Sequence, residues 1–179
     1  MLFTRKGDDG TSGLFGTPER FPKDAMIFEA LGAVDELNSL LGVCFSRAKI
    51  IRNKNSLMLG GIVRRAQENL FIVQAELAGA QKTLSKSHVD RLERDIAEIE
   101  GHIENPHSFI IPGATELSAL FDYARAVSRR AERHVVAARG VRPVSAHTYQ
   151  YLNRLSSLLY VLARYAALKK GTKEDAPSY

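Results

Sequence analysis

The fold is decided by the stretch AMIFEALGAVDELNSLLGVCFSRA, residues 25–48. Its large apolar residues recur at intervals of three and four positions, at Leu31, Val34, Leu37, Leu41 and Phe45. This spacing places them on one face of an α-helix, because a helix completes a turn in about 3.6 residues. The stretch therefore predicts an amphipathic helix that buries a single apolar stripe.

Four further stretches have the same helical periodicity, and they cover residues 56–81, 87–104, 115–139 and 143–169. Gly79 and the pair Asn105-Pro106 are typical helix stops, and Thr115 is expected to cap the fourth helix. Strand periodicity is nearly absent. We therefore predict an all-α fold, a five-helix up-and-down bundle over residues 25–170, followed by a loose polar tail at 171–179.

The composition is that of a single globular domain. The chain has 179 residues, of which 45% are hydrophobic and 25% charged, and its net charge of +5 is spread along the sequence. This charge permits nucleic-acid binding without requiring it, and no helix-turn-helix signal supports that alternative, so we predict no nucleic-acid partner. No segment approaches the roughly 18 apolar residues of a membrane span. The lone Cys44 is expected to be a buried core residue, and we expect a cytoplasmic protein without a membrane partner.

The N-terminal segment, residues 1–24, has no periodicity and carries a glycine at every third position over four repeats. Its central part, TRKGDDGTSGLFG at 4–16, combines glycines, hydroxyls, cations and carboxylates. A polyphosphate-binding loop uses this mixture, because glycine N–H groups and cations contact phosphate oxygens, while Asp8 or Asp9 can hold Mg²⁺ through water. The Gly-Lys-Ser/Thr of a Walker A loop is missing. From these residues alone, a nucleotide site and a flexible terminus are equally supported.

Three predicted helices carry a polar stripe beside the apolar one. The stripes are Asp35, Asn38, Ser39 and Gly42; Asp122, Arg125, Arg129 and Glu132; and Asn153, Ser157, Tyr160 and Arg164. A single stripe is usually the solvated face of an amphipathic helix. Three stripes containing small and amide residues are more typical of a wet cleft or a subunit interface.

The fourth predicted helix concentrates cations in the run RRAER, residues 129–133. Arg125, Arg129 and Arg133 follow one another at i, i+4, and such stacked guanidiniums repel unless an anion or carboxylates neutralise them. Two interpretations stay open: a triphosphate site completed by Asp35 or Glu132, and a solvated face neutralised by Glu132.

An apolar loop, SFIIP at residues 108–112, precedes this helix. Taken by itself, Phe109 in this loop is expected to anchor the core rather than to support a ligand.

Metal and nucleophile chemistry receive little support. The only Glu-x-x-His spacing of a di-iron bundle, Glu104 to His107, is interrupted by Pro106, and no two histidines stand at i, i+4. No Gly-x-Ser-x-Gly elbow is present. We predict no metal that is directly ligated by the protein.

Several motifs together resemble the PduO-type ATP:cob(I)alamin adenosyltransferases. They occur in family order, and they are TRKGDDGT (4–11), FEALGAVDELNS (28–39), AQENLF (66–71), AELA (75–78), FIIPG (109–113), AR (124–125), RRAER (129–133), YLNRLS (151–156) and VLAR (161–164). Each motif is modest, but their joint occurrence over nearly the whole chain is specific.

The resemblance implies a homotrimer that transfers the 5′-deoxyadenosyl group of ATP to cob(I)alamin, giving adenosylcobalamin and triphosphate. It implies that ATP lies between adjacent subunits, with Mg²⁺ on its phosphates, and that a flavoprotein reductase and a B12-dependent enzyme are partners. The residues that it assigns to ATP in the N-terminal segment are Thr4, Arg5, Lys6, Gly7, Ser12, Gly13 and Lys23. Those that it assigns to the phosphate, base or ribose surroundings are Arg129, Arg130, Glu132, Arg133 and Asn153.

The resemblance also implies the catalytic roles. Asp35 and Arg125 match a pair that forms an intersubunit salt bridge, and Arg129 contacts the nucleotide. Phe109 matches the aromatic residue that closes the lower face of the corrin ring, which leaves a four-coordinate cobalt that is easier to reduce. Because cob(I)alamin is a strong nucleophile, the protein needs no base and mainly aligns the reactants and stabilises the departing triphosphate.

The chain departs from the family pattern at three places. Ser157 stands where an Asp is usual, Ala114 replaces a second Gly, and Phe121-Asp122 replaces a Leu-His pair. Loss of the Asp carboxylate keeps open an alternative function, a non-catalytic trimeric module that binds or delivers ATP or adenosylcobalamin.

Overall fold

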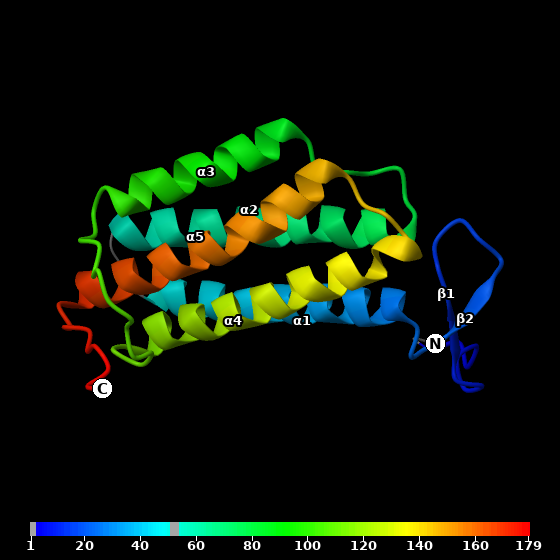
Figure 1. Ribbon diagram of the computed structural model, residues 1–179, viewed down its shortest axis with the longest axis horizontal. Helices are drawn as coiled ribbons and strands as arrows, with labels where there is room; N and C mark the ends of the chain where they lie inside the picture. Colours follow the sequence, from blue (N-terminus) through cyan, green and yellow to red (C-terminus); the bar gives the residue numbers. More distant parts are fainter. Residues whose placement is uncertain (1–2, 51–53) are drawn as a thin grey trace.

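The computed structural model describes the backbone of residues 3–50 and 54–179, and the side chains of residues 3–48 and 59–179. Its five helices are α1 (Met26–Ile50), α2 (Lys54–Ala78), α3 (Lys86–Glu100), α4 (Glu116–Ala137) and α5 (Ala146–Lys170). Each helix runs opposite to the one before it (Figure 1), so the predicted five-helix up-and-down bundle is confirmed. α4 packs between α1 and α5, α2 lies against α1, and α3 covers α5.

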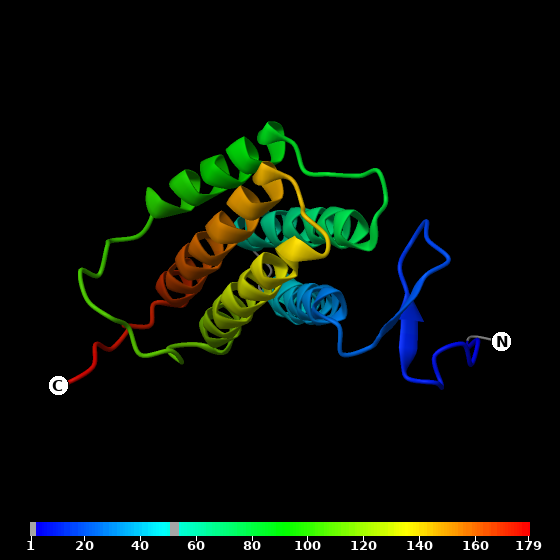
Figure 2. The same cartoon turned by 45° about the vertical axis from the view of Figure 1, so that its right-hand side comes forward.

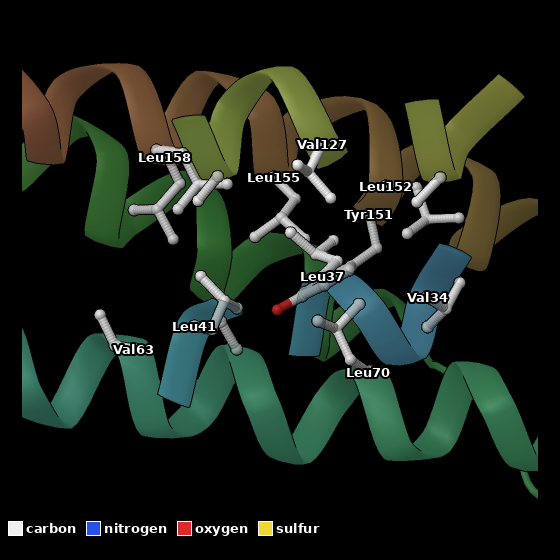
Figure 3. Packing of buried hydrophobic residues seen from close by; sticks show 14 of the residues in the cluster. Val34, Leu37, Leu41, Val63, Leu70, Val127, Tyr151, Leu152, Leu155 and Leu158 are labelled. Atoms are coloured by element: carbon white, nitrogen blue, oxygen red, sulfur yellow. The ribbon is translucent and has the colours of Figure 1, made fainter. Parts of the chain in front are cut away.

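The core forms where the apolar stripes of the helices meet. Leu37 and Leu41 of α1, Leu70 of α2, Val127 of α4 and Leu155 of α5 point into the same space (Figure 3), and each is at most 2% exposed. Fully burying one such side chain contributes about 1.5–3 kcal/mol of hydrophobic stabilisation. The stripe that predicts α1 is thus the stripe that the bundle buries.

The two ends of the α1 stripe are less buried than its centre. Leu31 and Phe45 are only half-buried and pack against the rim of the core. Cys44 is fully buried, as predicted. Burial raises the pKa of its thiol to about 12, because the thiolate cannot be solvated there.

Two of the predicted helix-end signals are confirmed, the Thr115 cap and the Gly79 stop, although α2 ends at Ala78 rather than near residue 81. The Thr115 side chain accepts a hydrogen bond from the Ser118 N–H at 3.1 Å and so caps α4. α2 ends at Ala78, and Gly79 follows with a φ of +100°. This left-handed conformation favours glycine.

The other boundaries differ from the prediction. α3 ends at Glu100 rather than at residue 104, because the chain leaves the helix at Gly101. α4 ends at Ala137, and a short 3₁₀ turn, η1 (Ala138–Gly140), follows it. α5 begins at Ala146 rather than near 143, because Ser145 is its N-cap and donates its own N–H to Glu76 Oε1 at 2.6 Å.

The sequence of the N-terminal segment suggested no regular structure, but the segment contains a short hairpin. Residues 1–2 of the predicted loop lie outside the described residues. Strands β1 (Thr11–Gly13) and β2 (Arg20–Pro22) pair antiparallel with Ser12 opposite Phe21. Three residues are too few for alternation to be visible in the sequence. Figure 2 shows this hairpin projecting from one end of the bundle.

The C-terminal tail, residues 171–179, is also more ordered than predicted. It contains no helix or strand, but the Ile111 N–H donates to the Asp175 carbonyl at 2.8 Å, and Glu174 pairs with Arg164. None of the described helices is long and apolar enough to span a bilayer.

Candidate functional site

The polar faces of α4 and α5 border an open pocket of about 350 Å³. Arg125 and Arg129, one helical turn apart on α4, supply its cations, and Ser156, Ser157 and Tyr160 of α5 also line it. Glu100, the last residue of α3, adds one carboxylate to the lining. A pocket with guanidiniums and hydroxyls on its walls is suited to an anion such as a phosphate group.

The guanidinium groups in this pocket are available for a ligand. Arg125 lies over the Tyr160 ring, with 5.8 Å between its central carbon and the ring centroid. Among the described side chains, no carboxylate oxygen lies within 4 Å of the nitrogens of Arg125 or Arg129. Glu132 accepts a hydrogen bond from Asn153 Nδ2 at 3.1 Å, and among the described side chains it forms no ion pair with Arg125 or Arg129. Both interpretations of the run at residues 129–133 stay predictions.

The neighbouring arginines have partners of their own. Arg130 forms an ion pair with Glu36 of α1, and this hydrogen-bonded contact raises the pKa of Arg130. Arg133 Nη1 donates to the Arg129 carbonyl at 3.1 Å and so stays on the surface of α4. The run at residues 129–133 therefore presents its charges in different directions, and Arg129 is the member that faces the pocket.

Asp35 is exposed on α1 and accepts a hydrogen bond from Gln74 Nε2 of α2 at 3.1 Å. It does not pair with Arg125 within the described part of this chain. Gln74 was not singled out from the sequence, because an amide on an otherwise ordinary helix gives no pattern.

The segment before α1 contributes the other group of site candidates. Thr4, Arg5, Lys6, Gly7, Ser12, Gly13 and Lys23 all lie in or next to its hairpin, exposed or half-buried. Lys23 Nζ donates to the Gly7 carbonyl at 2.7 Å, so these two candidates are brought together. Arg20, which sequence reasoning missed, donates to the carbonyls of Lys6 and Thr11 and holds the segment closed.

The two groups of candidates are not brought together within one chain. The hairpin lies beyond the end of the bundle at the start of α1, whereas Arg129 belongs to the middle of α4 (Figures 1 and 2). Among the described residues, one backbone hydrogen bond joins the hairpin to a helix other than α1: the Phe15 N–H donates to the Ala78 carbonyl of α2 at 3.0 Å.

Phe109 lies at the surface, so the expectation that it anchors the core is wrong. Its side chain is 77% exposed, so it is not a core anchor. Open hollows of about 330 and 480 Å³ flank its loop, and both are lined by Ile103 and Pro106. An exposed aromatic ring in a loop that lines such hollows is suited to a flat apolar ligand face.

The polar stripes are only partly surface features. Asn38 is 5% exposed, and the Asp122 and Arg164 side chains, 8% and 5% exposed, form an ion pair at 2.6 Å. The stripes therefore supply both pocket walls and buried polar contacts between helices. The spacing of the residues alone does not show which of them serve which purpose. No group of three or more His, Cys, Asp or Glu suited to a metal ion occurs among the described residues.

The chain is similar to known proteins both in sequence and in structure. The family model described as cobalamin adenosyltransferase matches residues 2–166. The corrinoid adenosyltransferase MMAB of Mus musculus is 34% identical over 97% of this chain and 75% of its own length. A corrinoid adenosyltransferase of Citrobacter freundii is 36% identical over 91% of this chain and 93% of its own length. A solved phenylalanine-to-alanine variant of a PduO-type ATP:corrinoid adenosyltransferase from Lactobacillus reuteri, complexed with cobalamin and ATP, superposes with a TM-score of 0.90 at 26% identity and covers 100% of both chains.

Proposed function

Because the chain belongs to the cobalamin adenosyltransferase family, we propose that its α4–α5 pocket and its N-terminal hairpin together bind the ATP that this family uses. The protein transfers the 5′-deoxyadenosyl group of ATP to a reduced corrinoid, cob(I)alamin, and releases triphosphate. The observation that carries the assignment of the site is the pair of arginines, Arg125 and Arg129, that face an open pocket and form no ion pair within 4 Å among the described side chains.

The chemistry divides between substrate and protein in a way that fits these residues. The cobalt of cob(I)alamin attacks the 5′ carbon of ATP, the carbon–oxygen bond to the triphosphate breaks, and the bonding electrons leave with the triphosphate. No protein base takes part. The protein contributes alignment of the reacting atoms and positive charge where the triphosphate departs.

We assign Arg129 to the triphosphate, because it faces the pocket. Arg130, Glu132 and Arg133 follow Arg129 on α4, and Asn153 of α5 donates a hydrogen bond to Glu132 at 3.1 Å. We assign these four residues to the surroundings of the nucleotide. Such groups are suited to ribose hydroxyls. The N-terminal residues Thr4, Arg5, Lys6, Gly7, Ser12, Gly13 and Lys23 close over the phosphates.

The site is completed by a second copy of the chain in a homotrimer. The separation of the hairpin from Arg129 within one chain supports this arrangement, because a hairpin that projects from the bundle can reach a neighbouring α4. Asp35 of one subunit pairs with Arg125 of the next. Among the described residues of the single chain, Asp35 accepts a hydrogen bond from the Gln74 amide and forms no ion pair.

Phe109 lies against the lower face of the corrin ring, where it excludes the lower axial ligand. Its 77% exposure supports this role, since an apolar ring so exposed gains most by covering an apolar ligand. The resulting four-coordinate cobalt accepts an electron more readily, so Phe109 assists the step from cob(II)alamin to cob(I)alamin.

Mg²⁺ is held by the phosphates of ATP rather than by a cluster of protein ligands. Asp8 is exposed in the hairpin and can contact such an ion through water, whereas Asp9 is already engaged by Thr11. A flavoprotein reductase supplies the electron and a B12-dependent enzyme consumes the product in the cytoplasm.

The test is turnover of ATP and Mg²⁺ with chemically reduced cobalamin, followed by the visible spectrum of the corrinoid. An adenosyltransferase converts many equivalents for each site. A module that only binds or delivers adenosylcobalamin would stop at one equivalent, and that result would reject the catalytic assignment.

A further inference from the structure

We propose that Arg164, held between Asp122 and Glu174, is a positioning residue that fastens the C-terminal tail, residues 171–179, to the loop that carries Phe109. The proposal rests on the function proposed for Phe109, because it concerns how the position of that ring is fixed. It assigns a role to a buried cluster and to a tail that the adenosyl-transfer chemistry does not itself require.

The cluster is a buried cation between two carboxylates. Arg164 Nη2 lies 2.6 Å from Asp122 Oδ2, and Arg164 Nε lies 2.8 Å from Glu174 Oε1. The three side chains are 5%, 8% and 16% exposed. The contact to Glu174 lacks hydrogen-bond alignment and therefore acts through charge. Removing one partner from such a cluster leaves a charge that is both buried and less compensated, which is costly.

The three residues come from distant parts of the chain. Asp122 is on α4, Arg164 is near the end of α5, and Glu174 lies beyond Gly171, whose φ of +71° turns the chain away from the helix. Tyr160 packs over the Arg164 guanidinium at 5.0 Å. The cluster thus ties the tail to both helices that line the α4–α5 pocket.

The tail in turn holds the Phe109 loop. The Ile111 N–H donates to the Asp175 carbonyl at 2.8 Å. Asp175 follows Glu174 in the tail, and Ile111 comes two residues after Phe109 in the loop. Loop residues Pro106 and Ile110 and tail residues Lys173 and Glu174 line the same hollow of about 480 Å³. The tail therefore forms one wall of a hollow that the Phe109 loop also lines.

Phe109 depends on this support because its own packing is slight. With 77% of its side chain exposed, the ring has little core contact to fix it. Among the described residues, the backbone hydrogen bond that joins this part of the loop to another segment is the one from Ile111 to Asp175, and it persists only while the tail stays in place. Burial raises the pKa of both Asp122 and Glu174, which agrees with carboxylates that are kept out of water by a fixed structure.

Glu174→Gln in the full-length protein tests the proposal, with Asp175→Asn as the matched control. Both variants remove one negative charge from adjacent tail residues, but the Asp175 side chain is exposed and its carbonyl is unchanged. Amide hydrogen exchange of Ile111, followed by NMR, is expected to be about tenfold faster in Glu174→Gln and unchanged in the control. Equal exchange in the two variants would overturn the fastening role.

Kinetics test the consequence for the site. We expect Glu174→Gln to raise the KM for the corrinoid severalfold, to slow assays begun with cob(II)alamin more than those begun with cob(I)alamin, and to leave the KM for ATP unchanged. Faster exchange at Ile111 without these kinetic changes would overturn the positioning role. A wild-type protein without turnover would reject the proposed function instead, and the exchange comparison would still decide whether Arg164 and Glu174 fasten the tail.

Discussion

At the scale of single residues, Arg129 carries the nucleotide assignment. Arg129→Ala should lower kcat/KM for ATP about thirtyfold, because a charge-assisted contact to phosphate contributes about 2 kcal/mol. Its side chain is exposed, so the bundle should keep its thermal stability. Steady-state kinetics with varied ATP measure the effect.

Arg94→Ala is the matched control for this measurement, because Arg94 is an exposed arginine on α3, away from the pocket. It should behave like the wild type. If Arg129→Ala also kept the wild-type KM and kcat, Arg129 would not contact the nucleotide.

Cys44 gives a second prediction at this scale. Its thiol is fully buried, and burial raises its pKa to about 12, so almost no thiolate is present at neutral pH. A chromogenic disulfide reagent should therefore leave the native protein unmodified and should titrate one thiol after unfolding in guanidinium. Rapid modification of the native protein would show that α1 opens locally at this position.

At the scale of elements, the N-terminal hairpin contains its own acid-sensitive contact. The Asp9 carboxylate accepts from the Thr11 hydroxyl at 2.7 Å and from the Thr11 N–H at 2.9 Å. These hydrogen bonds, helped by Arg20, lower the pKa of Asp9. A carboxyl group whose pKa is lower in the folded state stabilises it fully above the unfolded pKa, about 3.9, and loses that effect as the pH falls through the folded pKa.

The Thr11 amide signal should therefore titrate with a midpoint below that of an ordinary aspartate, and Asp9→Asn should abolish the titration. NMR of the hairpin amides between about pH 2 and pH 6, the range in which aspartates titrate, measures this midpoint. A midpoint at or above the ordinary value would show that the hairpin hydrogen bonds do not form in solution.

The elements also show what the sequence can and cannot reveal. The α1 stripe is predictable because Leu37 and Leu41 are large, apolar and regularly spaced, and burial follows from that spacing. The Thr115 cap is predictable because its hydrogen bond is local. The β1–β2 hairpin and the tail are not, since they depend on contacts such as Arg20 with Lys6 and Arg164 with Glu174, which join residues far apart in sequence.

The candidate site shows the same limit. Arg125 and Arg129 can be placed together from their spacing, because they share one face of a single helix. The exposure of Phe109 cannot be predicted, since an apolar residue between helices is ordinarily buried. Only the resemblance to a family suggests a ligand for it.

At the scale of the whole molecule, the proposed trimer predicts coupling between Asp35 and Arg125. Asp35→Asn and Arg125→Ala should each weaken the trimer or its activity, and the double variant should be little worse than either single one. Sedimentation and kinetics on the four proteins give the coupling energy, which should be about 1 kcal/mol or more for a direct pair. Simple addition of the two effects would mean that the residues do not meet in the assembly.

The central claim is that the arginine-lined pocket of one chain and the N-terminal hairpin of another form one ATP site. Mixing two variants of low activity, Arg129→Ala and Lys6→Ala, by refolding them together tests it most directly. If each site takes Arg129 from one subunit and the hairpin from another, about a quarter of the sites in randomly mixed trimers contain neither substitution. Adenosylcobalamin synthesis should then return to about a quarter of the wild-type rate. If mixed trimers form and synthesis stays at the level of the separate variants, both parts of the site belong to one chain and the claim is contradicted.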